Sequence, residues 1–347
     1  MIRRILKIAV ALSVIGFSYG QARDTVPNIS FALVGDIMLG SDYPDSSRVP
    51  PDDGVFLFSD AKKILSEADV AIGNLEGPIT NSDSCLKETS TGRVYAFRMP
   101  PSLAPVLADA GFDVLNTANN HSRDFGSAGR YDTERILDSL GIKHTGRLGD
   151  IARLNVRGKS ISVIGFCTSP GNYSLLDIDR AVSIVDSLDS ISDIVVVTFH
   201  GGGEGKKYIH LSNTVETFLG EDRGDLKKFA HNVIDAGADI VFGHGPHIPR
   251  AIEEYKGKII AYSLGNFCTW FGINIRGVNG YAPLLWIELT PDGELADLKI
   301  YSFEQQTNHY PVLDSENRAE KLILELSKSD VANVPVKLLN KENIYMK

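Results

Sequence analysis

The stretch Asp239–Phe267, DIVFGHGPHIPRAIEEYKGKIIAYSLGNF, contains two short apolar strands that each end in polar residues. The first strand, Ile240–Phe242, leads into the loop Gly243–His247, and the second, Lys258–Leu264, leads into Gly265–Phe267. A loop rich in Gly and Pro can aim its two histidine rings at one point, and neutral imidazole is the commonest metal ligand. The stretch therefore predicts a metal site at the ends of two strands. The alternative is a pair of surface histidines beside a turn.

The rest of the chain alternates between apolar, β-branched runs and segments with helical spacing of apolar residues. The strand-like runs are Ser30–Val34, Val70–Ile72, Phe112–Leu115, Ile161–Phe166 and Ile194–Phe199. The helix-like segments are Phe56–Ala68, Ser102–Ala110, Ala128–Leu140 and Leu226–Ala236. This alternation predicts an α/β fold with a mostly buried sheet.

Other segments complete the predicted organisation. Leu284–Thr290 and Leu295–Phe303 flank a Pro-Asp-Gly turn and predict a β-hairpin. Ser169–Ser192 is less regular, and Gly201–Glu221 reads as a long loop. Beyond these, one helix is expected at Glu316–Ser327. We expect one domain over residues 28–310 and a C-terminal appendage over residues 311–347.

Polar side chains follow five of the predicted strands. In chain order they are Asp36, Asn74, Glu76, Asn120, His121, His200, His244 and His247. In open α/β sheets, ligands bind outside the carboxyl ends of the strands. Carboxylate and amide oxygens mixed with imidazoles suit Mn, Fe, Zn or a mixed pair. Because the candidates outnumber the ligands of one tetrahedral ion, we expect two divalent ions, about 3.5–4 Å apart, with a bridging carboxylate.

Six motifs lie in order between about Ser30 and Tyr301. They are GDIMLG (35–40), GNLEGP (73–78), FRMP (97–100), ANNHSRDFG (118–126), GHGPH (243–247) and YSLGNF (262–267). Together they resemble the CapA family of poly-γ-glutamate capsule-synthesis proteins, which are built on the calcineurin-like metallophosphoesterase fold. The resemblance implies a four-layer αββα sandwich with a metal site at the strand ends. It also implies a role in making or exporting an anionic glutamate polymer at the cell envelope.

The resemblance further implies roles for single residues. The positions that match metal ligands are Asp36, Asn120, His200, His244 and His247. The bridging carboxylate falls in the region of Asn74 and Glu76, of which Glu76 is favoured because it is charged. His121 matches the histidine that assists the leaving group.

The chain departs from the metallophosphoesterase pattern at three points. Met38 stands where the first strand usually carries a histidine, and Asn74 stands where an aspartate is expected. The closing histidines are spaced His-x-x-His and not His-x-His. These departures imply a weakly held first ion or an altered ligand set, and they weigh against ordinary phosphatase chemistry.

Several roles stay open at this stage. In a hydrolase, His121 would give a proton to the leaving oxygen and Asp124 would orient it, although Asp124 could instead cap the next helix. Arg98 would clamp a phosphate or carboxylate, or else form a salt bridge to a nearby acid. Asn266 would position water or substrate, or else be a polar turn residue.

Charge and the N-terminus limit the partners and the location. The 347 residues include 44 acidic and 35 basic side chains, a net charge of −9, which argues against nucleic acid as the main partner. Arg3 and Arg4 precede the apolar run Ile8–Phe17 and a small-residue site near Ala22, which is typical of a signal peptide over residues 1–22. We expect secretion across the inner membrane to the periplasm or envelope, with an uncleaved N-terminal anchor as the alternative. The three cysteines do not form a disulfide framework.

Three functions fit these observations. The first is a metal-dependent hydrolase acting on a phosphoester. The second is a handling factor for poly-γ-glutamate, in which the metal rim binds the carboxylates of the polymer. The third is a non-catalytic scaffold that works with membrane-bound capsule synthesis partners.

Overall fold

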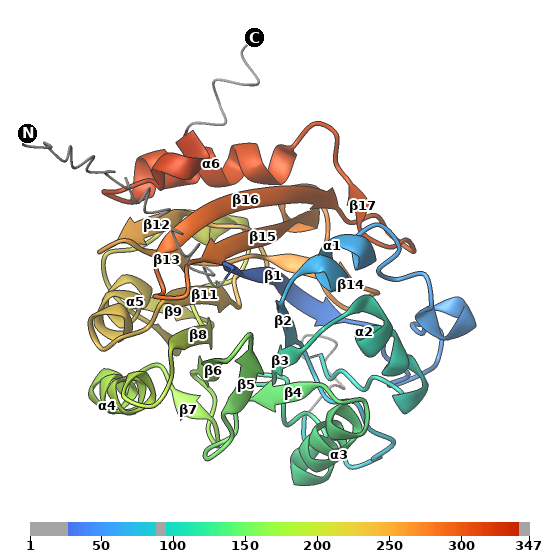
Figure 1. Ribbon diagram of the computed structural model, residues 1–347. Helices are drawn as coiled ribbons and strands as arrows, with labels where there is room; N and C mark the ends of the chain where they lie inside the picture. Colours follow the sequence, from blue (N-terminus) through green and yellow to red (C-terminus); the bar gives the residue numbers. More distant parts are fainter. Residues whose placement is uncertain (1–26, 88–94, 340–347) are drawn as a thin grey trace, which may run out of the picture.

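The computed structural model describes residues 27–87 and 95–339, and the predicted signal peptide lies outside this part (Figure 1). The first sheet has the order β17 (Val312–Leu313), β16 (Leu295–Glu304), β15 (Tyr281–Leu289), β1 (Ile29–Met38), β2 (Val70–Leu75), β3 (Val114–Asn116) and β4 (Lys143–Thr145), with β14 (Asn266–Thr269) paired to β1. The second sheet has the order β12 (Ile252–Tyr255), β13 (Lys258–Ala261), β11 (Ile240–His244), β8 (Ile194–His200), β6 (Lys159–Cys167) and β5 (Ala152–Val156), with β7 (Tyr173–Ser174) paired to β6. A separate hairpin joins β9 (Glu216–Phe218) to β10 (Glu221–Gly224).

The two sheets pack face to face, because alternate residues of a strand point to opposite sides of its sheet. Phe31 and Leu33 of β1 belong to a buried cluster that also contains Val196 of β8 and Phe242 of β11. Ala32 of β1 belongs to a second cluster on the outer face of the first sheet. The inner cluster therefore holds the two sheets together.

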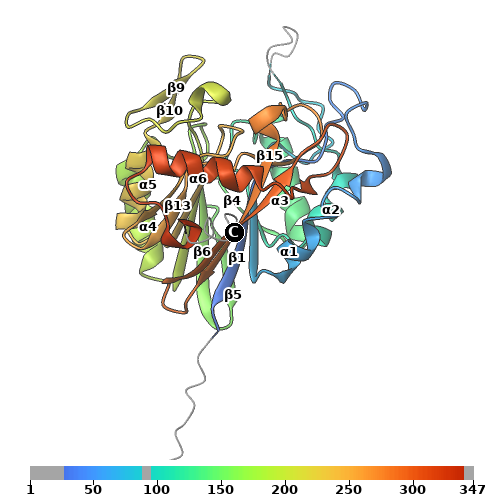
Figure 2. The same ribbon diagram turned by 90° about the horizontal axis from the view of Figure 1, so that it is seen from above.

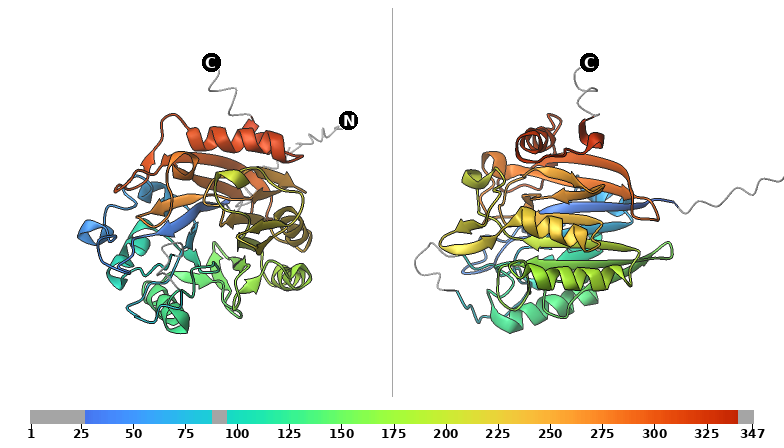
Figure 3. Two further views of the ribbon diagram at one scale, coloured as in Figure 1. Left: turned by 180° about the vertical axis from the view of Figure 1, so that it is seen from behind. Right: turned by 90° about the vertical axis from the view of Figure 1, so that its left-hand side faces the viewer.

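Helices cover the outer face of each sheet. They are α1 (Lys62–Glu67), α2 (Pro105–Ala110) and α3 (Gly126–Ser139) on the first sheet, and α4 (Ile178–Asp189) and α5 (Leu226–Asp235) on the second. Short 3₁₀ turns lie at Pro51–Gly54, Pro101–Leu103, Lys206–Tyr208 and Gly277–Gly280. Figures 2 and 3 show the two groups of helices on opposite sides of the sheets. The predicted α/β class is confirmed, and the layers follow the order helix, sheet, sheet, helix.

One more helix, α6 (Arg318–Asp330), crosses an edge of the sandwich (Figure 2). It contacts β15 and β16 of the first sheet and β12 of the second. Its Ile323 and Leu324 enter the inner cluster. The predicted domain limits, 28–310 with an appendage at 311–347, stay a prediction. No helix in the described ranges has both the length and the apolar character needed to cross a membrane.

The structure differs from the sequence-based prediction in two segments. The prediction of an irregular Ser169–Ser192 is wrong, because this segment contains α4, whose first turn is capped by the carboxylate of Asp177. Its buried residues Ala181, Val185 and Leu188 recur at helical spacing. The predicted long loop at Gly201–Glu221 contains strand β9 as well as irregular backbone.

Candidate functional site

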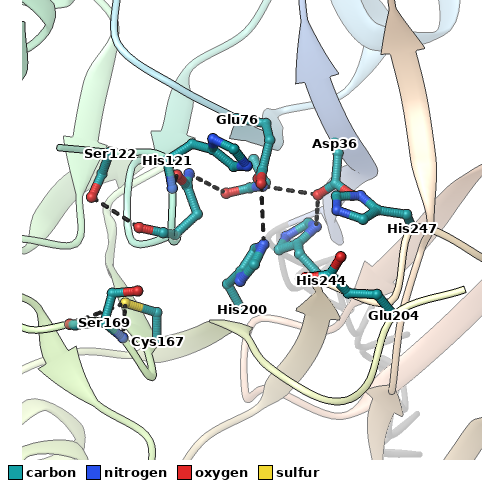
Figure 4. A network of polar contacts seen from close by, with 12 residues as sticks. Asp36, Glu76, His121, Ser122, Cys167, Ser169, His200, Glu204, His244 and His247 are labelled. Atoms are coloured by element: carbon teal, nitrogen blue, oxygen red, sulfur yellow. Dashed lines mark hydrogen bonds and ion pairs between the residues drawn. The ribbon is translucent and has the colours of Figure 1, made fainter. Parts of the chain in front are cut away.

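Two rows of polar residues face each other where the parallel strands of the two sheets end. In the first sheet, Asp36 on β1 is in register with Asn74 on β2 and with Asn266 on β14. In the second sheet, His244 on β11 is in register with His200 on β8. Figure 4 shows both carboxylates, Asp36 and Glu76, close to histidines from the second sheet. The predicted strand-end residues thus meet at one rim.

Asp36 is fully buried between two histidines. Its Oδ2 lies 2.8 Å from Nδ1 of His247, and its Oδ1 lies 3.5 Å from Nδ1 of His244. Strand β1 shifts its register on both sides of Asp36, and such bulges re-aim a side chain. Burial favours protonation of Asp36, but the hydrogen bonds to the two histidines outweigh burial and hold its pKa well below the usual value. Asp36 is therefore an anion at neutral pH.

Glu76, one residue beyond β2, supplies the second buried carboxylate. Its Oε1 lies 3.3 Å from Nε2 of His200. Burial raises the pKa of Glu76, but the attraction of His200 outweighs burial and lowers this pKa to about 2. The site thus holds two ionised carboxylates, one from β1 and one from the end of β2.

Asn74 lies between the two carboxylates and donates to both. Its Nδ2 is 2.8 Å from Oδ1 of Asp36 and 2.6 Å from Oε2 of Glu76. Its Oδ1 accepts from the Nδ2 atoms of Asn116, at 2.9 Å, and Asn119, at 3.2 Å.

This network fixes which end of the Asn74 amide faces the carboxylates. Oδ1 of Asn116 accepts from the backbone N–H of Ala118, and Oδ1 of Asn119 accepts from that of His121, so both amides must present nitrogen to Asn74. The Asn74 oxygen is therefore occupied by amide donors. In this arrangement Asn74 positions two carboxylates and does not offer its oxygen as a ligand.

His247 is held in a left-handed backbone conformation, with φ of 57°, which is uncommon for a residue other than glycine and clusters at functional sites. Nδ2 of Asn266 donates to the carbonyls of His247 and Asn279, at 3.2 and 3.1 Å, and Oδ1 of Asn266 lies 3.1 Å from the His247 ring. Burial lowers the pKa of His247, but its hydrogen bond and attraction to Asp36 outweigh burial and raise this pKa to about 9. Asn266 is thus occupied in positioning His247.

The loop between the two closing histidines has little room. Gly245 has φ of 109°, and a Cβ there would lie 2.8 Å from the carbonyl oxygen of Gly201. Nε2 of His244 lies 3.1 Å from Oγ1 of Thr198, so the ring is oriented from behind and its Nδ1 faces Asp36. Burial lowers the pKa of His244.

A second group, formed by His121, Asp124 and Lys87, flanks the carboxylates. Nδ1 of His121 is 2.8 Å from Oδ2 of Asp124, and because a carboxylate only accepts, this ring nitrogen carries the proton. The Lys87 ammonium lies 2.7 Å from the other Asp124 oxygen and 3.0 Å from Nδ1 of His121. Asp124 therefore orients His121, and Lys87 offsets the buried charge of Asp124.

Several buried polar atoms of the site have no hydrogen-bond partner among the described residues. They are Oε1 of Glu76, Oδ1 of Asn120, Nε2 of His200 and Nδ1 of His244. Such atoms are rare in proteins unless water, an ion or a ligand completes them. No three or more His, Cys, Asp or Glu side chains in the described residues are arranged to hold a metal as they stand. The carboxylates and histidines bond directly to one another, and a cation would have to enter between them.

The predicted anion clamp Arg98 lies in ion pairs. Its Nε is 2.6 Å from Oδ1 of Asp42, and its Nη1 is 2.6 Å from Oδ1 of Asp83. This is the salt-bridge alternative, and binding of a substrate anion by Arg98 stays a prediction.

A cavity of about 260 Å³, the metal-site cavity, opens beside the carboxylates and histidines, and its walls include His121, Glu204 and His247. Phe97 also lines it and stacks on the His121 ring at a centroid distance of 4.3 Å. A ligand in this cavity would therefore touch both the His121 group and the closing histidine.

Sequence reasoning missed four supporting residues: Lys87, Asn116, Asn119 and Thr198. Asn116 and Asn119 flank the recognised Asn-His motif, so the density of amides there was a usable signal. Lys87 and Thr198 belong to no motif, and only the fold brings them to the site.

Comparison with known protein families identifies the part of the chain that carries this rim. A family model described as "Bacterial capsule synthesis protein PGA_cap" matches residues 30–269, well over half of the chain. The chain belongs to this family. The strand-end residues from Asp36 to Asn266 all fall inside the matched range, and Asn279 lies outside it. The rim is therefore built from the part of the chain that matches the PGA_cap family.

Relatives of the family carry names that point to capsule synthesis. The chain is 30% identical over 258 residues to "PGA biosynthesis protein CapA" of Bacillus subtilis (strain 168), covering 69% of this chain and 63% of that protein. It is 27% identical over 260 residues to "Capsule biosynthesis protein CapA" of Bacillus anthracis, covering 69% of this chain and 59% of that protein. The chain thus spans less than two thirds of the length of these relatives.

A solved structure with a related arrangement is the 5′-nucleotidase precursor of Thermus thermophilus. It aligns at 14% identity with a TM-score of 0.44, covering 87% of this chain and 59% of that one. A score below 0.5 carries no weight here, so the fold assignment depends on the chain's own sheets and core.

Proposed function

We propose that the chain acts at the cell envelope in poly-γ-glutamate capsule biosynthesis or export, as a metal-dependent hydrolase of an anionic substrate. The observation that carries this proposal is the meeting of two ionised carboxylates, Asp36 and Glu76, with His200, His244 and His247 beside a cavity. The family and the names of its relatives support the capsule context.

The ligand set would draw on both rows of the rim. The residues that would hold divalent ions, of which we expect two, are Asp36, Glu76, Asn120, His200, His244 and His247. This mixed set of oxygen and nitrogen donors suits Mn, Fe or Zn. Asn74, which was also predicted as a ligand, would act by holding the two carboxylates in place. When bound, the ions would activate water and offset the charge that develops on the substrate.

His121 would handle the proton of the leaving group. Its Nδ1 donates to Asp124, so Nε2 is the ring nitrogen that is left for the cavity that His121 lines. Asp124 would stabilise the protonated ring, which then gives its proton from Nε2 to the leaving oxygen. Lys87 would keep Asp124 ionised through their 2.7 Å contact.

Substrate contacts would come from the cavity walls. Asn266 would contribute through His247, whose ring and backbone it holds. Arg98 would bind a substrate anion only by leaving Asp42 and Asp83.

A second candidate function is binding of the polymer without turnover. The donor amide of Asn74 between the carboxylates favours it, because an amide stands where metallophosphoesterases place an aspartate. In this case the metal rim would bind polymer carboxylates and the chain would serve membrane-bound synthesis partners as a scaffold.

Turnover with defined metals separates these candidates. We expect the protein purified without its first 22 residues to hydrolyse a chromogenic phosphoester or a γ-glutamyl oligomer with Mn or Zn. His244→Ala should lose both metal and activity, and His121→Ala should lose activity but keep metal. Bound metal without turnover on any of these substrates would support the binding function and refute the hydrolase.

A further inference from the structure

A second, larger cavity adjoins the metal-site cavity. It has a volume of about 480 Å³. The two cavities share the wall residues Tyr95, Gly272, Ile273 and Asn274. A ligand longer than the first cavity can therefore extend from His121 and His247 into the second one.

The loop between β14 and β15 forms the shared wall and is tied to the His121 group. Gly272 has φ of 85°, and a Cβ there would lie 2.7 Å from Cε1 of Phe97, which stacks on His121. The preceding residue, Phe271, also has a positive φ, of 62°, which is strained for a bulky side chain. The loop is thus held in an uncommon conformation directly beside the metal-site cavity.

Two arginines line the second cavity, and no acidic residue does among the described residues. Arg48 comes from the segment after β1 and Arg276 from the loop before β15. The remaining polar walls are uncharged side chains: Thr269, Asn274, Thr307 and Asn308. A cleft lined by charge of one sign concentrates the field and attracts the opposite charge. This cavity is therefore a local basic site on a chain with a net charge of −9.

Neither arginine side chain is engaged by the described residues. No hydrogen bond or ion pair within 4.0 Å joins the guanidinium of Arg48 or Arg276 to any of them, whereas Arg98 has two carboxylate partners. Asp45 is the carboxylate near Arg48. The pKa of Asp45 is lowered mainly by its hydrogen bond from the Ser47 hydroxyl, and Arg48 adds a smaller attraction. Both guanidinium groups are thus available to a ligand.

We propose that this basic cavity is a subsite for further anionic groups of an extended substrate whose reacting group lies in the metal-site cavity. The inference rests on the proposed function for the position of the reacting group. Guanidinium groups bind carboxylates and phosphates with paired hydrogen bonds, so a polyanionic chain fits both arginines at once. We commit to a polycarboxylate chain such as a γ-glutamate oligomer, and short polyphosphate serves as the discriminating probe.

The test compares binding of a γ-glutamate hexamer, free glutamate and a short polyphosphate by isothermal titration calorimetry at fixed salt. The variants are Arg48→Gln, Arg276→Gln and the double variant. Arg135→Gln is the matched control, because Arg135 is exposed on α3 and lines neither cavity. Unchanged thermal unfolding of the variants checks their folding, since neither arginine side chain bonds to the described residues.

We expect each substitution to weaken hexamer binding about tenfold and the control to change it little. Free glutamate should bind weakly to every variant. Hexamer binding that is equal in the double variant and the control would overturn the subsite. Arginine-dependent binding of polyphosphate in preference to the hexamer would overturn the polycarboxylate assignment.

A separate measurement on the same variants keeps this inference apart from the proposed function. Turnover of a small phosphoester needs the metal-site cavity alone, so the arginine variants should keep it. A wild-type protein that has no turnover but shows arginine-dependent hexamer binding would refute the hydrolase and leave the subsite standing.

Discussion

Replacing Asn74 by aspartate tests the arrangement at the centre of the site. Asn74 donates to Asp36 at 2.8 Å and to Glu76 at 2.6 Å. The substitution removes both donated hydrogen bonds and places a third carboxylate against two that are already ionised. In the protein without metal, Asn74→Asp should therefore lower the free energy of unfolding.

The size of the effect follows from two routes that the new carboxyl can take. If it stays ionised, each like-charged neighbour costs about 4 kcal/mol at an effective dielectric constant of about 20. If it takes up a proton at pH 7, moving a group with an ordinary pKa of about 3.9 to its neutral form costs about 4 kcal/mol. By the second route the cost falls to about 1.5 kcal/mol at pH 5. The folded-state pKa is raised, so the penalty is largest at high pH and shrinks as the pH falls.

Thermal and urea unfolding in EDTA measure this penalty. For a chain of this size we expect Tm to fall by roughly 8 °C at pH 7 and by clearly less at pH 5. Asn232→Asp is the control, because its amide donates to a backbone carbonyl on the exposed side of α5 and faces no carboxylate among the described residues. Added Mn should stabilise the Asn74→Asp variant more than the wild type, because a cation offsets the third charge. A variant as stable as the wild type in EDTA, or a penalty that does not depend on pH, would refute the reasoning.

Three further predictions concern other parts of the molecule. Arg250→Ala breaks a fully buried ion pair with Glu216, with contacts of 2.9 and 3.0 Å, and should destabilise the chain by about 3–5 kcal/mol in urea unfolding; a loss under about 1 kcal/mol would show that Glu216 finds another partner. Metal binding should strengthen about tenfold per pH unit between pH 6 and 8, because a proton must leave His247, whose pKa is about 9, and a chelator competition that shows no pH dependence in this range would contradict this. His121→Gln should lower kcat by about a hundredfold or more with unchanged metal content, whereas a changed metal content would make His121 a ligand.

The sequence was sufficient for the fold class and for most of the rim. Apolar runs that end in Gly-Asp, Gly-Asn or Gly-His can be read locally, and parallel strands bring their ends together. Asp36, Asn74 and Asn266 accordingly stand in one row, and His200 and His244 in the facing row.

What the sequence could not supply depends on contacts between distant segments. The orientation of the Asn74 amide is decided by Asn116 and Asn119, which the fold places behind it. Arg98 meets Asp42, 56 residues earlier in the chain, and no local pattern predicts that pair. The helix α4 was missed although Asp177 caps it, because a short amphipathic segment between Gly-containing turns reads as irregular.

The most direct test of the central claim is the metal content of the purified wild-type protein, measured by inductively coupled plasma mass spectrometry after dialysis against Mn or Zn. The arrangement of Asp36, Glu76, His200, His244 and His247 predicts about two bound ions per chain and loss of metal in His244→Ala. A wild-type protein that binds neither ion and gains no thermal stability from them would contradict the account.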